Sequence, residues 1–106
     1  MAFFSFKKHP ETAQMALELP VNFIEEGNSV IAYTPALDLS TAGKDREDAK
    51  RMFGEVVKIF FKDLIENNTA DEVLLPLGWT KHHESSDWIP PKITQESVDV
   101  RVPVAA

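Results

Sequence analysis

DREDAKRMFGEVVKIFFKDLIEN, residues 45–67, decides the fold of this 106-residue chain. Asp45 is a favourable N-cap, and the carboxylates of Glu47 and Asp48 complement the positive end of a helix dipole. Apolar residues then recur mostly at spacings of three and four, as on one face of a helix: Ala49, Met52, Phe53, Val56, Ile59, Phe60, Phe61, Leu64 and Ile65. The pattern predicts an amphipathic helix of about five to six turns, which must lie across a sheet or another helix.

Upstream of this segment, three extended stretches are predicted. Apolar residues alternate with other residues between Leu17 and Phe23, which predicts a strand. Residues 29–34 (SVIAYT) have the composition of a second strand. Gly27-Asn28 between them tolerates positive φ, so the pair predicts a β-hairpin. Residues 36–42 predict a third strand, ended by Gly43, where we expect a backbone conformation that other residues resist.

Downstream, Asn67-Asn68 is expected to end the helix, and Thr69 with Glu72 forms a capping-box pattern for a short second helix. Pro76 and Gly78 then stop that helix. Residues 79–95 are predicted to be a surface loop that Trp79 and Trp88 anchor. The alternating valines of residues 97–104 predict a final strand, which Pro103 assigns to a sheet edge.

These elements predict an α+β fold of order β-β-β-α-(α)-β, with one antiparallel sheet covered by one long helix. A single domain is expected over residues 1–106, with its core in residues 15–67 together with strand 97–104. Because the chain contains no cysteine, disulfides, thiolate nucleophiles and cysteine-ligated zinc are excluded.

The chain is acidic, with 17 Asp and Glu residues against 11 Lys and Arg residues and a formal charge of −6. This charge repels a phosphate backbone and makes nucleic acid an unfavourable partner. It favours encounter with a basic protein, although acidity also simply maintains solubility. No apolar stretch is long enough for a signal peptide or a membrane span, so we expect a cytoplasmic protein.

The hairpin and the start of the long helix resemble the HicB-type antitoxin domain. The resemblance rests on residues 23–27 (FIEEG), residues 30–37 (VIAYTPAL), Gly43 and residues 47–49, and its fold motif comprises Tyr33, Pro35, Leu37, Gly43 and Asp45. It implies a fold similar to half of an RNase H-like or double-stranded-RNA-binding core. It also implies a protein-binding domain, which either neutralises a small, basic, HicA-like ribonuclease toxin or acts as an orphan regulatory module. Only two residues follow the last predicted strand, so the DNA-binding module that often follows this domain is not expected.

Other groupings of polar residues have two interpretations each. His82-His83-Glu84 could ligate a divalent ion, but adjacent residues of an extended chain point to opposite sides, which favours a solvated loop. The acidic residues near the hairpin turn and at the helix start could perform acid-base chemistry, but both places favour acids for structural reasons. We therefore expect no enzyme activity, no catalytic residue, no metal and no cofactor.

The residues predicted to contact a protein partner are Glu25, Glu26, Asp38, Trp79 and Trp88. A homodimer formed through an edge strand is also expected. The alternative function is an RNA-binding module, which the double-stranded-RNA-binding-like topology suggests by analogy. The phenylalanines near the N-terminus could pack against the domain or stack on bases beside Lys7 and Lys8.

Overall fold

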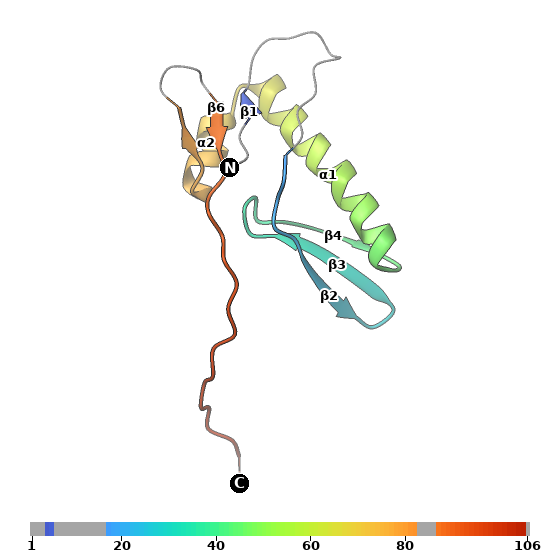
Figure 1. Cartoon of the computed structure of the whole chain (residues 1–106). Helices are drawn as coiled ribbons and strands as arrows, with labels where there is room; N and C mark the ends of the chain where they lie inside the picture. The colour runs from blue at the N-terminus through green and yellow to red at the C-terminus, as the bar shows by residue number, and fades with distance from the viewer. Residues whose placement is uncertain (1–3, 6–16, 83–86, 106) are drawn as a thin grey trace.

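The computed structural model describes residues 4–5, 17–82 and 87–105. Along the chain it contains β1 (Phe4–Ser5), β2 (Asn22–Glu26), β3 (Ser29–Thr34), β4 (Leu39–Gly43), α1 (Arg46–Asn67), α2 (Ala70–Leu74), the 3-10 helix η1 (Leu75–Leu77), β5 (Thr80–Lys81) and β6 (Asp87–Ile89). Figure 1 shows α1 crossing a sheet formed by β2, β3 and β4. The α+β class, and a three-stranded antiparallel sheet followed by a long helix, are confirmed.

The main sheet is an antiparallel meander of order β2-β3-β4. Its hairpin turn is Gly27-Asn28, as predicted, and Gly27 has the positive φ of 60° that this turn needs. The first strand begins at Asn22 and not at Leu17. Pro20 explains the later start, because a proline has no amide hydrogen to donate to the neighbouring strand.

Helix α1 begins and ends where the sequence predicts. The carboxylate of Asp45 accepts a hydrogen bond of 2.8 Å from the amide of Asp48, and Asn68 ends the helix with a φ of 53°. The Asp48 carboxylate in turn accepts hydrogen bonds from the Lys44 amide and from Arg51, which lowers the pKa of Asp48. The bonds donated by the Asp48 and Lys44 amides give partners to backbone groups at and just before the start of the helix.

Gly43 marks the closest approach of the sheet to α1. A Cβ atom at this position would lie 2.8 Å from the Cα atom of Ala49, in addition to meeting its backbone nitrogen. Among the described glycines, only Gly27 and Gly78 have positive φ. The expectation of an unusual backbone conformation at Gly43 is therefore wrong, and lack of space for a side chain explains the glycine.

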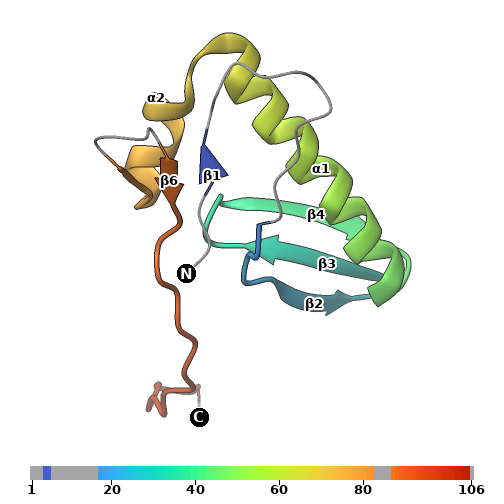
Figure 2. The same ribbon diagram turned by 45° about the horizontal axis from the view of Figure 1, so that its top comes forward.

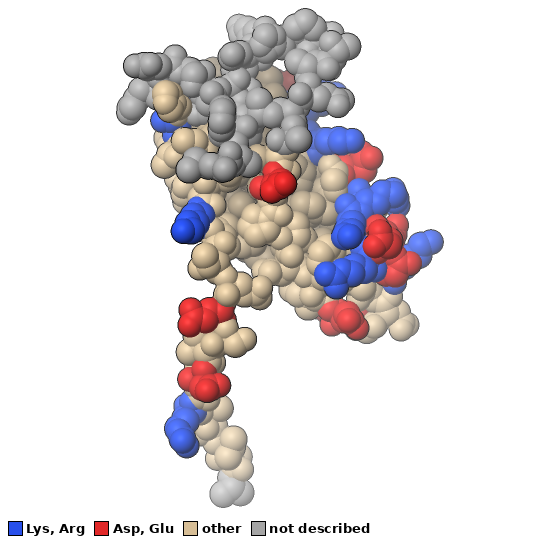
Figure 3. Space-filling model, viewed as in Figure 1, with Lys and Arg blue, Asp and Glu red and all other residues tan. Residues whose placement is uncertain are grey.

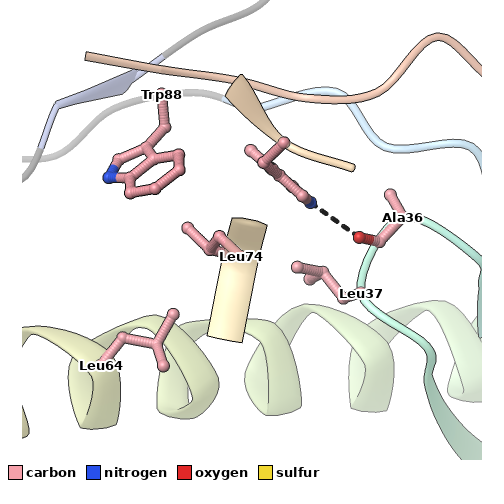
Figure 4. Close-up of a cluster of buried hydrophobic side chains, with 6 residues drawn as sticks. Ala36, Leu37, Leu64, Leu74 and Trp88 are labelled. Carbon is pink, nitrogen blue, oxygen red and sulfur yellow. Dashed lines mark hydrogen bonds between the residues drawn. The ribbon is translucent and has the colours of Figure 1, made fainter. Parts of the chain in front are cut away.

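A buried cluster joins the end of α1 to the second half of the chain. It contains Ala36, Leu37, Leu64, Leu74, Trp79 and Trp88, the labelled members of which appear in Figure 4. The indole nitrogen of Trp79 donates a 2.7 Å hydrogen bond to the carbonyl oxygen of Ala36. Trp88 lies in β6, which pairs with β1 and β5 in a second small sheet.

The region between residues 79 and 95 is therefore not a simple surface loop. It contains β5 and β6, and both tryptophans are only 1% exposed. The short helix before it begins after Thr69 as predicted, but the Thr69 side chain makes no capping hydrogen bond.

The predicted final strand, residues 97–104, is wrong. Residues 90–105 contain no helix or strand, and the four valines at positions 98, 100, 102 and 104 are 69–84% exposed. Figures 1 and 2 show this C-terminal tail leaving the body of the molecule and running clear of the main sheet. An alternating sequence specifies which side chains share a face of a strand, but a strand forms only where a neighbour supplies hydrogen bonds.

Candidate partner-binding surface

The two faces of the main sheet differ in what covers them. Helix α1 covers the face that contains Phe23, Ala32 and Thr34. The guanidinium group of Arg46 in α1 lies 4.3 Å from the centre of the Phe23 ring, and Ala32 and Thr34 are fully buried. In Figures 1 and 2, none of the described helices lies on the opposite side of the sheet.

We call this opposite side the open sheet face. Because side chains alternate between the two faces of a strand and the register of the three strands is known, its members follow directly: Asn22, Ile24, Glu26, Ser29, Ile31, Tyr33, Ser40 and Ala42. Ile24 is 47% exposed, and Ile31 and Tyr33 are half-buried. The face thus presents apolar and aromatic side chains with polar groups around them, a composition common in protein interfaces.

Asp38, a predicted partner-binding residue, lies at the edge of this face. It occupies the turn before β4 with a φ of 50°, a conformation that aspartate tolerates better than most residues. The hydroxyl of Tyr33 donates a hydrogen bond of 3.0 Å to the Asp38 carboxylate. That bond, with smaller contributions from burial and from the carboxylate charge, raises the pKa of Tyr33. The tyrosine therefore holds an exposed carboxylate in one position.

Glu25 and Glu26, the other predicted acidic contacts, lie at the end of β2 beside the hairpin turn. Both are exposed. Ser29 stabilises the turn by donating a 3.1 Å hydrogen bond to the carbonyl oxygen of Glu26. The structure thus gathers all three predicted acidic residues on one sheet, at its two turns.

Charge is distributed unevenly along the chain. Residues 17–43, which include the whole main sheet, contain Glu18, Glu25, Glu26 and Asp38 and no Lys, Arg or His. The absence of basic residues from this stretch is readable in the sequence, and it identifies the sheet as the acidic part of the molecule. The apolar residues of the open face carry no comparable signal, because alternation alone does not say which face a helix will cover.

Helix α1 carries balanced charge. Its sequence contains five basic residues (Arg46, Lys50, Arg51, Lys58 and Lys62) and five acidic ones (Glu47, Asp48, Glu55, Asp63 and Glu66). Three ion pairs join them, at 2.8–3.9 Å. On the face drawn in Figure 3, basic and acidic side chains are interspersed over this helix.

Trp79 and Trp88 do not belong to an exposed surface. Both side chains are buried, Trp79 hydrogen-bonds to Ala36, and its ring packs edge-on against that of Phe61. The two residues were predicted as partner contacts, but their burial places them in the core, so this prediction is wrong for the isolated chain.

His82 of the proposed metal cluster is exposed, whereas His83 and Glu84 lie outside the described residues. Within residues 4–5, 17–82 and 87–105, no three His, Cys, Asp or Glu side chains are grouped so that they could hold a metal ion. In the same ranges, no helix combines the length and the apolar character needed to cross a bilayer.

A shallow groove of about 600 Å³ lies between α1 and the segment that precedes β2. It is lined by Leu17, Glu18, Leu19, Phe53, Gly54 and Val57. Glu18 is the only titratable side chain in this lining, so the groove offers no pair of groups for acid-base or nucleophilic chemistry.

Comparison with protein-family models, with curated proteins and with solved structures finds no match to the chain.

Proposed function

We propose that this chain is an antitoxin-like protein-binding domain whose main sheet engages a small basic protein of the HicA-like ribonuclease class. The observation that carries the proposal is the location of the acidic residues. Four carboxylates and no basic group lie in residues 17–43, which include the whole sheet. The open sheet face presents Ile24, Ile31 and Tyr33, with Glu26 on the same face and Asp38 at its edge. An apolar centre with a charged rim suits a specific protein partner of opposite charge.

The sequence pattern from residue 23 to residue 49 supports the toxin class of the partner, because it resembles the HicB-type antitoxin domain. The acidic residues at the two turns of the sheet, Glu25, Glu26 and Asp38, accelerate the encounter with a basic ribonuclease. The apolar residues of the open sheet face provide the contact area. Neutralisation requires only that the bound domain cover the toxin's active site, so the antitoxin needs no catalytic residue of its own.

Co-expression tests the proposal. Any small basic reading frame that adjoins the gene for this chain is expressed alone and together with this chain. We expect the basic protein alone to arrest growth, the pair to restore it, and the two proteins to purify as a complex that weakens as salt concentration rises. The absence of any such neighbouring frame, or growth arrest that this chain does not relieve, would contradict the proposal.

RNA binding, the alternative suggested by topology, has weaker support. A surface that binds duplex RNA needs unpaired basic groups that replace counterions on phosphates. The charges of α1 cancel and are largely paired, and the main sheet is acidic. A gel-shift titration with duplex RNA decides between the two functions: no shift at moderate salt is expected, and a clear shift would favour the alternative.

A further inference from the structure

The C-terminal tail has the sequence of a strand but has no neighbouring strand. Val98, Val100, Val102 and Val104 alternate with Asp99, Arg101 and Pro103. All four valines are exposed, by 69–84%. Ile93 still packs against the core, so the unpaired segment begins at about residue 94. A row of four exposed valines on an extended chain is costly in water and favours pairing with another strand.

The position of the proline shows which edge of the tail can pair. Successive amides of a strand point to opposite edges. The nitrogen of Pro103 therefore belongs to the edge that also carries the amides of residues 97, 99 and 101, and this edge lacks one donor. The other edge, with the amides of the four valines, is complete.

The main sheet offers two end strands within the described part of the chain, β2 and β4. Strand β2 ends in Glu25 and Glu26, and such charges oppose the approach of a further acidic strand. Strand β4, Leu39–Gly43, contains no charge and no proline. Residues 94–105 carry Glu96, Asp99 and Arg101, a net charge of −1, so β4 is the more favourable acceptor.

Charge also selects the direction of pairing. Strand β4 is flanked by Asp38 before it and Lys44 after it. An antiparallel tail places Asp99 nearer to Lys44 than to Asp38 and Arg101 nearer to Asp38 than to Lys44, so that each tail charge lies closer to its opposite charge. A parallel tail reverses both pairs.

We propose that the tail of one copy pairs antiparallel with β4 of a second copy, and that the second copy's tail does the same in return. Figures 1 and 2 show that the tail runs clear of the sheet of its own chain. Every chain supplies one donor strand and one acceptor edge, so a two-fold exchange closes with none left over. The result is a homodimer whose main sheets are each extended by one strand, in the manner of β-strand addition.

The test compares two proline variants of the full chain by light scattering after size-exclusion chromatography, from low-micromolar to near-millimolar concentration. Val100→Pro removes an amide from the pairing edge, and Ser97→Pro, the matched control, removes one from the other edge without changing a charge. We expect wild type and Ser97→Pro to have twice the chain mass of 11.9 kDa. Val100→Pro should raise the dimer dissociation constant by about tenfold to a hundredfold, because a two-fold dimer loses two backbone hydrogen bonds and each contributes a factor of about three to ten.

Both substitutions lie in the exposed tail, which Figures 1 and 2 show running clear of the main sheet, so the helical circular-dichroism signal of α1 should be unchanged in each. A monomeric wild type at every concentration would overturn the proposal. A dimer that Val100→Pro leaves intact, or that both variants weaken equally, would overturn it as well.

Disulfide trapping tests the acceptor strand. The chain contains no cysteine, so introduced pairs report without background. Val100→Cys is combined with Thr41→Cys or Ala42→Cys in β4, and, as the control, with Glu25→Cys in β2. Oxidation should yield a covalent dimer linking residue 100 of one copy to β4 of the other. Trapping only with Glu25→Cys, or only between two copies of residue 100, would contradict pairing at β4.

Discussion

Gly43 is the residue on which the contact between sheet and helix depends. A methyl group there would meet the backbone of Ala49, which cannot move without displacing the start of α1. Gly43→Ala should therefore lower the free energy of unfolding by about 1–3 kcal/mol, as overpacking does. Urea denaturation followed by circular dichroism measures the change.

The matched control for this prediction is Gly54→Ala. Gly54 lies within α1, and an added Cβ atom would meet nothing within 4 Å. Alanine is the better helix former, so the control should raise the free energy of unfolding by about 0.8–1 kcal/mol. Equal stability of Gly43→Ala and wild type would show that the sheet and helix are not in the contact described.

Tyr33 reports on the position of Asp38. It is the only tyrosine of the chain, so its ionisation can be followed by ultraviolet absorbance during a pH titration. Its pKa is raised above the ordinary value of 10.0 by the hydrogen bond to Asp38. Asp38→Asn should return the pKa of Tyr33 toward 10.0, whereas Glu26→Gln should not change it. An unchanged pKa in Asp38→Asn would mean that the hydrogen bond is absent.

The raised pKa of Tyr33 determines how the contribution of this hydrogen bond to folding stability changes with pH. The folded state favours the neutral phenol, so this contribution is fully present below the unfolded pKa of Tyr33 and is lost as pH rises through the folded pKa. At neutral pH Tyr33 is therefore neutral, and its hydroxyl donates the hydrogen bond that positions the Asp38 carboxylate at the edge of the open sheet face.

Among the elements, α1 was predictable because its determinants are local. Asp45 at the start, apolar residues at helical spacing and Asn68 at the end act within one stretch of chain. The C-terminal tail has an equally clear strand pattern, yet residues 97–104 form no strand. Whether an alternating segment becomes a strand depends on a partner edge elsewhere, which its own sequence does not specify.

The N-cap of α1 can be tested by substitution of Asp45. Asp45→Ala removes the acceptor for the Asp48 amide and should lower the free energy of unfolding by about 1 kcal/mol. Asp45→Asn keeps an acceptor oxygen and should lose less. Chemical denaturation of the two variants makes the comparison, and equal losses would show that the side-chain oxygen of residue 45 does not cap the helix.

For the whole molecule, the sequence indicated the acidic residues of the candidate surface but not their arrangement. Glu25, Glu26 and Asp38 were identifiable from their position at turns. Trp79 and Trp88 were predicted to lie in a surface loop. The residues next to them in the sequence do not indicate the hydrogen bond from Trp79 to Ala36, 43 residues earlier. Contacts over such separations arise from packing of the complete chain, which local patterns do not encode.

In the proposed function, the acidic main sheet, and not helix α1, meets a basic protein partner. This proposal is tested most directly by measuring association rates between the co-purified partner and two double variants with the same change in net charge. Glu25→Lys/Glu26→Lys alters the sheet, and Glu55→Lys/Glu66→Lys alters α1. We predict that the sheet variant associates more slowly by on the order of tenfold, with little remaining dependence on salt, and that the helix variant resembles wild type. Equal slowing in both variants, or slowing in the helix variant alone, would contradict the claim.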